Sequence, residues 1–119
     1  MVELLYVEDD EATRLYSQEF LARKGHIVHL AEDGLEGLDL LRKVDGIQII
    51  FADFHMPRMN GLRFFEKVRN DPDYVKYSTT PVIGAGTFPA YSKNRLTECL
   101  EKPFESSELL RCIQQYCRK

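Results

Sequence analysis

The sequence is poor in cysteine and lacks the cysteine pattern of a zinc-binding or disulfide-rich protein. Its three cysteines, Cys99, Cys112 and Cys117, are odd in number and do not form the C-x-x-C spacing of a zinc site. Cys112 and Cys117 lie five positions apart on a predicted helix, which turns them away from each other and argues against a disulfide. We therefore expect reduced thiols, as in a cytoplasmic protein.

Long hydrophobic runs are also missing. The apolar stretch at residues 47–52 is far shorter than the roughly 20 residues that span a bilayer. The first residues, Met-Val-Glu, do not have the form of a signal peptide. The sequence thus predicts a soluble chain without a membrane partner, located in the cytoplasm.

The sequence has no excess of positive charge. Its formal net charge is -3, and the 29% of residues that are charged mix both signs along the chain. Such a surface does not neutralise a phosphate backbone, which argues against direct binding to nucleic acid and favours a protein partner. With 119 residues, 44% of them hydrophobic, the chain has material for one core, and we expect a single domain over residues 1–119.

Short apolar runs alternate with helical patterns from one end of the chain to the other. The predicted strands cover residues 2–7, 26–31, 47–52, 81–85 and 97–100. Helices are predicted after Asp10, after Asp33, after Asn60 and over 107–116. Near-continuous apolar strands separated by helices predict an α/β fold, a doubly wound parallel sheet with helices on both faces.

Apolar residues recur within these helices at the spacing of a packed face. The repeats are Ala12, Leu15, Tyr16 and Phe20; Leu35, Leu38 and Leu41; Leu62, Phe65 and Val68; and Leu109, Leu110, Ile113 and Tyr116. Between the last two strands, residues 86–96 leave only eleven positions, with a proline near the start. We expect a short or distorted fourth helix there.

Acidic residues stand at the carboxyl ends of two predicted strands. Glu8 and Asp9 follow the first strand and Asp53 follows the third, so a doubly wound sheet brings all three to one edge. Carboxylates within a few ångströms of one another repel, so such a cluster needs a shared proton, a nearby lysine or a bound hard divalent cation. Mg2+ is the natural choice for this cation. Lys102 follows the fifth strand and should reach the same pocket. A lysine, a cation and an accessible carboxylate together indicate phosphoryl transfer.

Three strings, LLYVEDD, FADFHMPRMNG and EKPF, in this order and spacing resemble the receiver domain of two-component response regulators. The resemblance spans essentially the whole chain, and the three strings together are highly specific. It implies a flavodoxin-like fold with a five-stranded parallel sheet in the order 2-1-3-4-5. It also implies that a sensor histidine kinase or a histidine phosphotransfer protein donates a phosphoryl group to Asp53.

The same resemblance assigns roles to the remaining site residues. Glu8 and Asp9 look like the Mg2+ acids, joined by Asp53 and by the backbone carbonyl of His55. Lys102, before what is commonly a cis proline bond, looks like the lysine that contacts the phosphate. We do not expect an enzyme with turnover, since a receiver transfers phosphate only to itself and hydrolyses it slowly.

Two positions depart from the family pattern. The family places a threonine or serine at the end of the fourth strand and an aromatic residue on the fifth, where this chain has Gly86 and Cys99. Either a bulge lets the Thr87 hydroxyl replace the missing one, or no hydroxyl reaches the phosphate, which we favour. We expect phosphorylation to survive and the signal to leave through a rearranged loop after the fourth strand.

Two function hypotheses follow. The first is a switch in which phosphorylation of Asp53 changes a protein interaction; the alternative is a pseudo-receiver that binds a protein constitutively without phosphorylation. Intact Glu8, Asp9 and Lys102 favour the switch, because a module without chemistry has no reason to hold carboxylates together. A hydrolase of the haloacid dehalogenase type normally needs a second aspartate where this chain has His55. The sequence leaves open whether the receiver acts alone or belongs to a longer regulator.

Overall fold

The computed structural model describes residues 1–89 and 96–117. Five strands form one parallel sheet in the order β2-β1-β3-β4-β5, which confirms the predicted flavodoxin-like topology. The strands are β1 (Glu3–Val7), β2 (Ile27–Ala31), β3 (Ile49–Asp53), β4 (Val82–Ala85) and β5 (Glu98–Leu100). All five residues of β3, the central strand, are buried. The continuous apolar sequence predicts this for the first four, and the fifth is Asp53.

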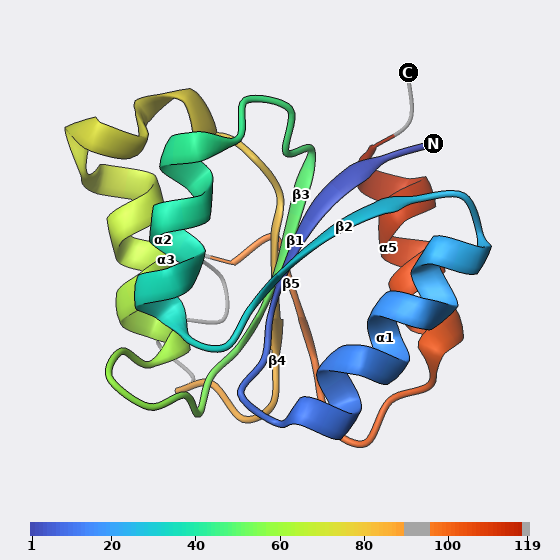
Figure 1. Ribbon diagram of the computed structural model, residues 1–119. Helices are drawn as coiled ribbons and strands as arrows, with labels where there is room; N and C mark the ends of the chain where they lie inside the picture. Colours follow the sequence, from blue (N-terminus) through green and yellow to red (C-terminus); the bar gives the residue numbers. More distant parts are fainter. Residues whose placement is uncertain (90–95, 118–119) are drawn as a thin grey trace.

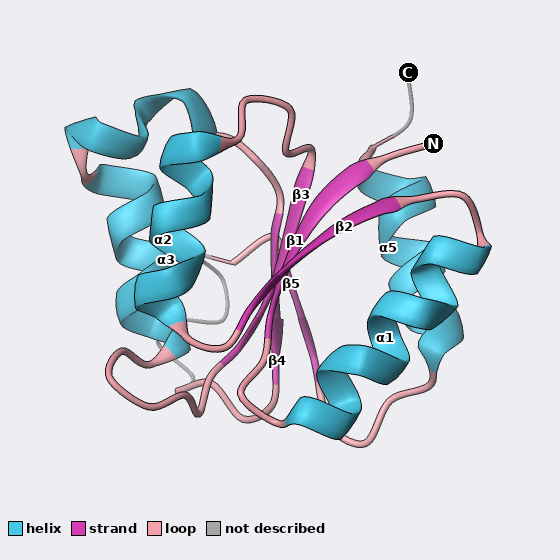
Figure 2. Ribbon diagram, viewed as in Figure 1, coloured by secondary structure: helices cyan, strands magenta, loops and turns pink. Residues whose placement is uncertain are grey.

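Helices cover the sheet on both faces. The helices are α1 (Glu11–Arg23), α2 (Gly34–Lys43), α3 (Gly61–Asn70) and α5 (Ser106–Tyr116), with a 3-10 helix, η1 (Pro72–Tyr77), after α3. Figure 1 and Figure 2 show α2 and α3 on one side of the sheet and α1 and α5 on the other. Of the segment in which a short fourth helix was expected, residues 90–95 lie outside the described residues, and residues 86–89 are not helical.

A hydrophobic core lies on each face of the sheet. Under α2 and α3 it includes Leu5, Val7, Leu38, Leu41, Ile50, Phe64, Phe65 and Val68. Under α1 and α5 it includes Leu4, Tyr6, Leu21, Ile49, Phe51, Ile83, Leu109 and Ile113. Alternate residues of each strand therefore enter opposite cores, as the period of two in a strand requires.

The apolar repeat that predicted α1 does not coincide with the buried face of this helix. Leu15 and Tyr16 are 50% and 63% exposed, whereas α1 buries Arg14, Ser17 and Leu21. The inward residues satisfy polar groups of β1 and its end: Arg14 donates to the carbonyl of Glu8, and the hydroxyl of Ser17 donates to that of Tyr6. A buried polar group without a partner costs free energy, and we infer that this cost exceeds that of leaving the Leu15 and Tyr16 side chains exposed.

In α2, too, one residue of the apolar repeat lies outside the core. Leu35 is 42% exposed, although Leu38 and Leu41 are buried as expected. The helix instead turns two glycines inward, since a β carbon at Gly34 would lie 3.0 Å from Met59 and one at Gly37 would lie 3.0 Å from Phe64. These close contacts with α3 and the preceding loop fix the rotation of α2 and leave Leu35 outside.

Candidate functional site

The predicted acidic residues meet at the carboxyl edge of the sheet. Asp53 is the last residue of β3, and Glu8 and Asp9 follow β1, its neighbour. One carboxylate oxygen from each of the three lies within 4.8 Å of the other two. Glu8 and Asp53 are only 2% and 6% exposed, while Asp9 faces the solvent. The cluster is thus mostly buried but open on one side.

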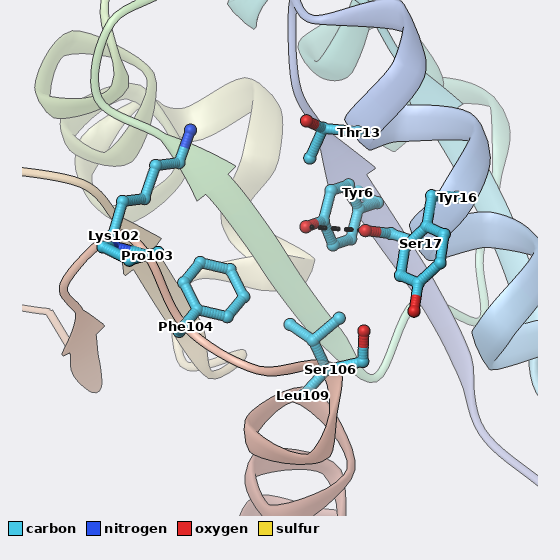
Figure 3. Close-up of a pocket in the computed structure, with 9 residues that line it drawn as sticks. All are labelled: Tyr6, Thr13, Tyr16, Ser17, Lys102, Pro103, Phe104, Ser106 and Leu109. Atoms are coloured by element: carbon cyan, nitrogen blue, oxygen red, sulfur yellow. Dashed lines mark hydrogen bonds between the residues drawn. The ribbon is translucent and has the colours of Figure 1, made fainter.

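Lys102 reaches this cluster from the end of β5, as predicted. Its Nζ lies 3.2 Å from Oε1 of Glu8 and 3.2 Å from Oδ2 of Asp53. Figure 3 shows the side chain extending toward the carboxyl end of β3. The peptide bond from Lys102 to Pro103 is cis, the isomer that the resemblance implied.

The charges of the cluster do not balance. Burial raises the pKa of Glu8 and the charge of Asp53 raises it further, although the N–H of Asp10, which donates to Glu8 Oε2, opposes the rise. Burial lowers the pKa of Lys102, but the charges of Glu8 and Asp53 outweigh this and raise it overall. Three carboxylates face one ammonium, and their oxygens are the ligands that a hard divalent cation prefers. The residues therefore fit a metal ion of this class.

The start of α3 lies unusually close to the end of β3. A β carbon on Gly61 would sit 2.3 Å from the backbone oxygen of Asp53, so only glycine fits there. The N–H of Gly61 donates to the carbonyl of Phe54 at 2.8 Å, and the side chain of Asn60 accepts from the N–H of Arg63. The asparagine and glycine of FADFHMPRMNG thus begin α3 directly behind the Asp53 backbone.

Two further predicted site residues do not point a side chain into the cluster. His55 lies edge-on against Phe54, with ring centroids 4.8 Å apart, and its predicted role concerned the backbone carbonyl, which stays a prediction. Thr87 is exposed, and no hydrogen bond within residues 1–89 and 96–117 joins its hydroxyl to Asp53. The bulge that would bring Thr87 to the phosphate is therefore not formed in this structure.

A glycine occupies the place beside Asp53. Gly86 has φ +102°, and a β carbon there would lie 3.2 Å from Oδ1 of Asp53. Its N–H donates to the carbonyl of Leu100 at 2.9 Å, and its own carbonyl lies 3.6 Å from the sulfur of Cys99. The two departures from the family pattern are therefore in direct contact with each other.

Sequence reasoning missed two residues around the site. Phe88, two positions after Gly86, is 2% exposed and packs on β4. Arg14 is 8% exposed and donates to the backbone beside the acids. A single aromatic residue in a loop and an arginine in a helix belong to no sequence motif. Their positions beside the site become apparent only from the strand register and from the rotation of α1.

A pocket of about 430 Å³ opens beside Lys102, between α1 and the segment that leads into α5 (Figure 3). Its lining residues are Tyr6, Thr13, Tyr16, Ser17, Lys102, Pro103, Phe104, Ser106 and Leu109. Figure 3 shows the hydroxyls of Tyr6 and Ser17 bonded to each other at the back of the pocket. The exposed ring of Tyr16 stands at its rim.

Residues 4–114 match the family model of the response regulator receiver domain. The chain belongs to this family. The receiver is 39% identical over 83 residues to a chemotaxis protein CheY homolog of Campylobacter jejuni. The aligned part covers 69% of this chain and 62% of that protein. It is 30% identical to the response regulator MprA of Mycolicibacterium vanbaalenii, with 99% of this chain but 51% of that protein covered.

Solved receiver structures share the fold. The chemotaxis response regulator CheY4 of Vibrio cholerae has a TM-score of 0.85 and 30% identity, with 98% of both chains covered. The receiver domain of a Pseudomonas aeruginosa sensor histidine kinase has a TM-score of 0.80 and 21% identity over 97% of this chain and 96% of that one. That structure holds a magnesium ion in its active-site cleft. Within the described part of this receiver, no helix has the length and apolar character needed to cross a membrane.

Proposed function

We propose that this receiver is a phosphorylation switch whose acceptor is Asp53. The observation that carries the proposal is the contact of one ammonium with two buried carboxylates: Lys102 Nζ lies 3.2 Å from both Glu8 and Asp53. In the transfer, an oxygen of Asp53 forms a bond to phosphorus while the N–P bond of a phosphohistidine breaks, and the histidine nitrogen keeps the electron pair. The donor is a sensor histidine kinase or a histidine phosphotransfer protein, since receiver domains pair with histidine kinases.

Glu8, Asp9 and Asp53 would hold Mg2+, with the backbone carbonyl of His55 as a further ligand. When bound, this ion supplies positive charge to the phosphoryl oxygens during transfer. Lys102 holds another of these oxygens as a point charge with three donors. Asp53 is the nucleophile, and its burial keeps competing water away from one side. The receiver is the substrate of this single transfer and has no turnover as an enzyme.

Gly86 leaves the phosphoryl group without the usual hydroxyl. A charge-assisted hydrogen bond of this kind is worth roughly 1.5 to 3 kcal/mol, which weakens the active state without removing the acceptor or the acids. Phosphorylation of Asp53 then has to shift the backbone at Gly86 directly, because Gly86 lies against the Asp53 carboxylate. The signal passes to a protein partner through residues 86–89, in which Phe88 is anchored on β4.

A constitutive binding module remains the second candidate. The contact between Gly86 and Cys99 favours it, because neither residue can act as the usual hydroxyl or aromatic of the switch. The buried pair of Glu8 and Asp53 opposes it. Two desolvated carboxylates side by side cost stability, and phosphoryl transfer gives a reason for keeping them that constitutive binding does not.

Intact mass spectrometry after incubation with acetyl phosphate and Mg2+ tests the proposal. An adduct of one phosphoryl group that disappears in Asp53→Asn and without Mg2+ supports the switch. A wild-type protein that binds Mg2+ but gains no adduct, even from histidine kinases, would leave the constitutive module. Circular dichroism of Asp53→Asn checks that loss of the adduct does not reflect loss of the fold.

A further inference from the structure

Arg14 lies beneath the acidic cluster and is bound to its backbone. Although arginine side chains are rarely buried, this one is 8% exposed. Its Nη1 donates to the carbonyl of Glu8 at 2.9 Å and lies 3.4 Å from the carbonyl of Asp9. These two carbonyls belong to the residues that carry two of the three carboxylates.

The segment from Glu8 to Asp10 is otherwise held by few bonds. The N–H of Glu8 donates to the carbonyl of Ala31 on β2 at 3.0 Å, which fixes the first peptide after β1. Asp10 caps α1 through the N–H of Thr13, and its own N–H donates to Glu8 Oε2 at 3.2 Å. Between these anchors, Arg14 is the side chain within residues 1–89 and 96–117 that binds the two carbonyls. It therefore helps to direct the Asp9 side chain and that of Glu8, whose carboxylate Lys102 and the N–H of Asp10 also hold.

We propose that Arg14 is a positioning residue for Mg2+ binding, and this inference rests on the proposed function. The guanidinium keeps Glu8 and Asp9 in the arrangement in which their oxygens and that of Asp53 lie within 4.8 Å. Residues behind the ligands of a metal commonly act in this way, by fixing the ligands before the ion arrives. Arg14 would not touch the ion or the phosphoryl group.

The charge of Arg14 acts in the opposite direction to its hydrogen bonds. A positive charge beneath the acids repels a cation, so its removal alone would tighten Mg2+ binding. Removal of the hydrogen bonds frees the two carbonyls and would weaken Mg2+ binding. The proposal states that positioning is the larger effect, which gives the experiment a definite sign.

Calorimetric titration of the full chain with MgCl2 tests this. We expect Arg14→Met to raise the Mg2+ Kd by about ten-fold, the lower end of the effect of removing a residue that orients metal ligands. Arg14→Lys keeps the charge but replaces the rigid, planar guanidinium by a flexible ammonium on a shorter side chain, so its Kd should lie between those of Arg14→Met and the wild type. Circular dichroism verifies the fold of each variant.

Two variants on α1 serve as controls. Ser17→Ala loses the bond to the Tyr6 hydroxyl on the same buried face, and Arg23→Met loses an exposed arginine paired with Glu19. Both should keep the wild-type Kd. A ten-fold weakening by Ser17→Ala as well would overturn the proposal, because general loosening of α1 would then explain the result.

The remaining outcomes separate the two proposals. If the wild type binds Mg2+ and Arg14→Met binds it equally or more tightly, the positioning role is wrong while the proposed function stands. If the wild type itself does not bind Mg2+, the proposed function fails first. Should Arg14→Met not fold, Arg14→Lys decides, since a Kd equal to that of the wild type contradicts the role.

Discussion

The ring of Phe88 lies directly on Gly84: a β carbon at Gly84 would be 2.6 Å from Cε1 of Phe88. In the sheet, Gly84 is level with Ala52 on β3 and Cys99 on β5, so three small residues form a row across this face. Phe88 is 2% exposed and meets the ring of Phe54 edge-on, with centroids 4.9 Å apart. The loop after β4 is therefore anchored by an aromatic side chain that needs small neighbours beneath it.

Loss of this anchor should be costly. Phe88→Ala removes a buried ring and should lower the free energy of unfolding by about 3 kcal/mol, measured by urea denaturation. Gly84→Ala should also destabilise the wild type, because the new methyl group displaces the ring, but should cost less in the Phe88→Ala background. Additive losses in the double variant would show that the two positions do not interact.

The same loop should respond to phosphorylation. We expect hydrogen exchange in residues 86–89 to change when Asp53 is phosphorylated, because Gly86 lies against the Asp53 carboxylate and Phe88 follows two residues later. Mass spectrometry of peptides from this loop, with Asp53→Asn as the unphosphorylated reference, measures the change. Exchange that stays the same in this loop would contradict the proposed route of the signal.

A side chain at Gly86 should impair the acceptor. Gly86→Ala forces a β carbon to 3.2 Å from Asp53 Oδ1 and also strains a backbone with φ +102°. Gly25→Ala is the matched control, because Gly25 has φ +90° and nothing within 4 Å of its β carbon position. Both variants should lose about 1 kcal/mol of stability from the strain, but only Gly86→Ala should slow phosphorylation by acetyl phosphate. Equal phosphorylation rates would show that Asp53 is not crowded.

The sequence predicted the topology and the acidic cluster because both follow from order along the chain. Strands that alternate with helices place their carboxyl ends at one edge of the sheet. The proximity of Glu8, Asp53 and Lys102 could therefore be predicted from the sequence alone. The packed face of α1 could not be predicted in this way. Leu15 and Tyr16 have the right spacing, but the polar needs of β1 turn Arg14 inward, and spacing does not show which polar groups lack a partner.

The contact between Phe88 and Gly84 was equally out of reach of sequence patterns. In the sequence, Gly84 only lowers the propensity of its segment to form a strand. Whether the Phe88 ring can pack on it depends on which residues of β3 and β5 lie beside it. Such register between strands far apart in the chain is set by the whole sheet.

An ion pair joins β5 to α5 and should give stability that depends on pH. Arg111 donates to both carboxylate oxygens of Glu98, and the hydroxyl of Tyr116 donates to Oε1 at 2.6 Å. The hydrogen bonds from Arg111 lower the pKa of Glu98 although burial raises it. The folded pKa is thus below the unfolded value of about 4.3, so the pair stabilises the fold above that pH, and this is lost as pH falls through the folded pKa.

Glu98→Gln tests this dependence. At pH 7 we expect it to cost up to about 1 kcal/mol, as for a partly exposed ion pair, in urea denaturation. The difference from the wild type should shrink from pH 5 toward pH 3. A double-mutant cycle with Arg111→Met isolates the pair from other effects of each change. A difference that is unchanged at pH 3 would mean that packing, and not charge, is responsible.

The exposed apolar residues of α1 should matter only when the phosphoryl donor is a protein. Leu15 and Tyr16 are 50% and 63% exposed, and Tyr16 borders the pocket that Lys102 and Phe104 also line. A protein that brings a phosphohistidine to Asp53 has to cover this side of the sheet edge, and an aromatic side chain there is a typical site of strong binding. Acetyl phosphate needs no such surface, because it reaches Asp53 by diffusion.

We therefore expect Tyr16→Ser to slow phosphotransfer from a histidine kinase or phosphotransfer protein about ten-fold, the equivalent of about 1.4 kcal/mol of binding. Its rate with acetyl phosphate should equal that of the wild type, because Tyr16 is not among the residues that form the acidic cluster. Val75→Ser is the control, since Val75 is 70% exposed on η1, which packs against α3 on the opposite face of the sheet. Radiolabel transfer measures both donors in parallel. If Tyr16→Ser slowed both donors alike, its effect would lie within the acceptor site; if Val75→Ser slowed the protein donor equally, α1 would have no special part in docking.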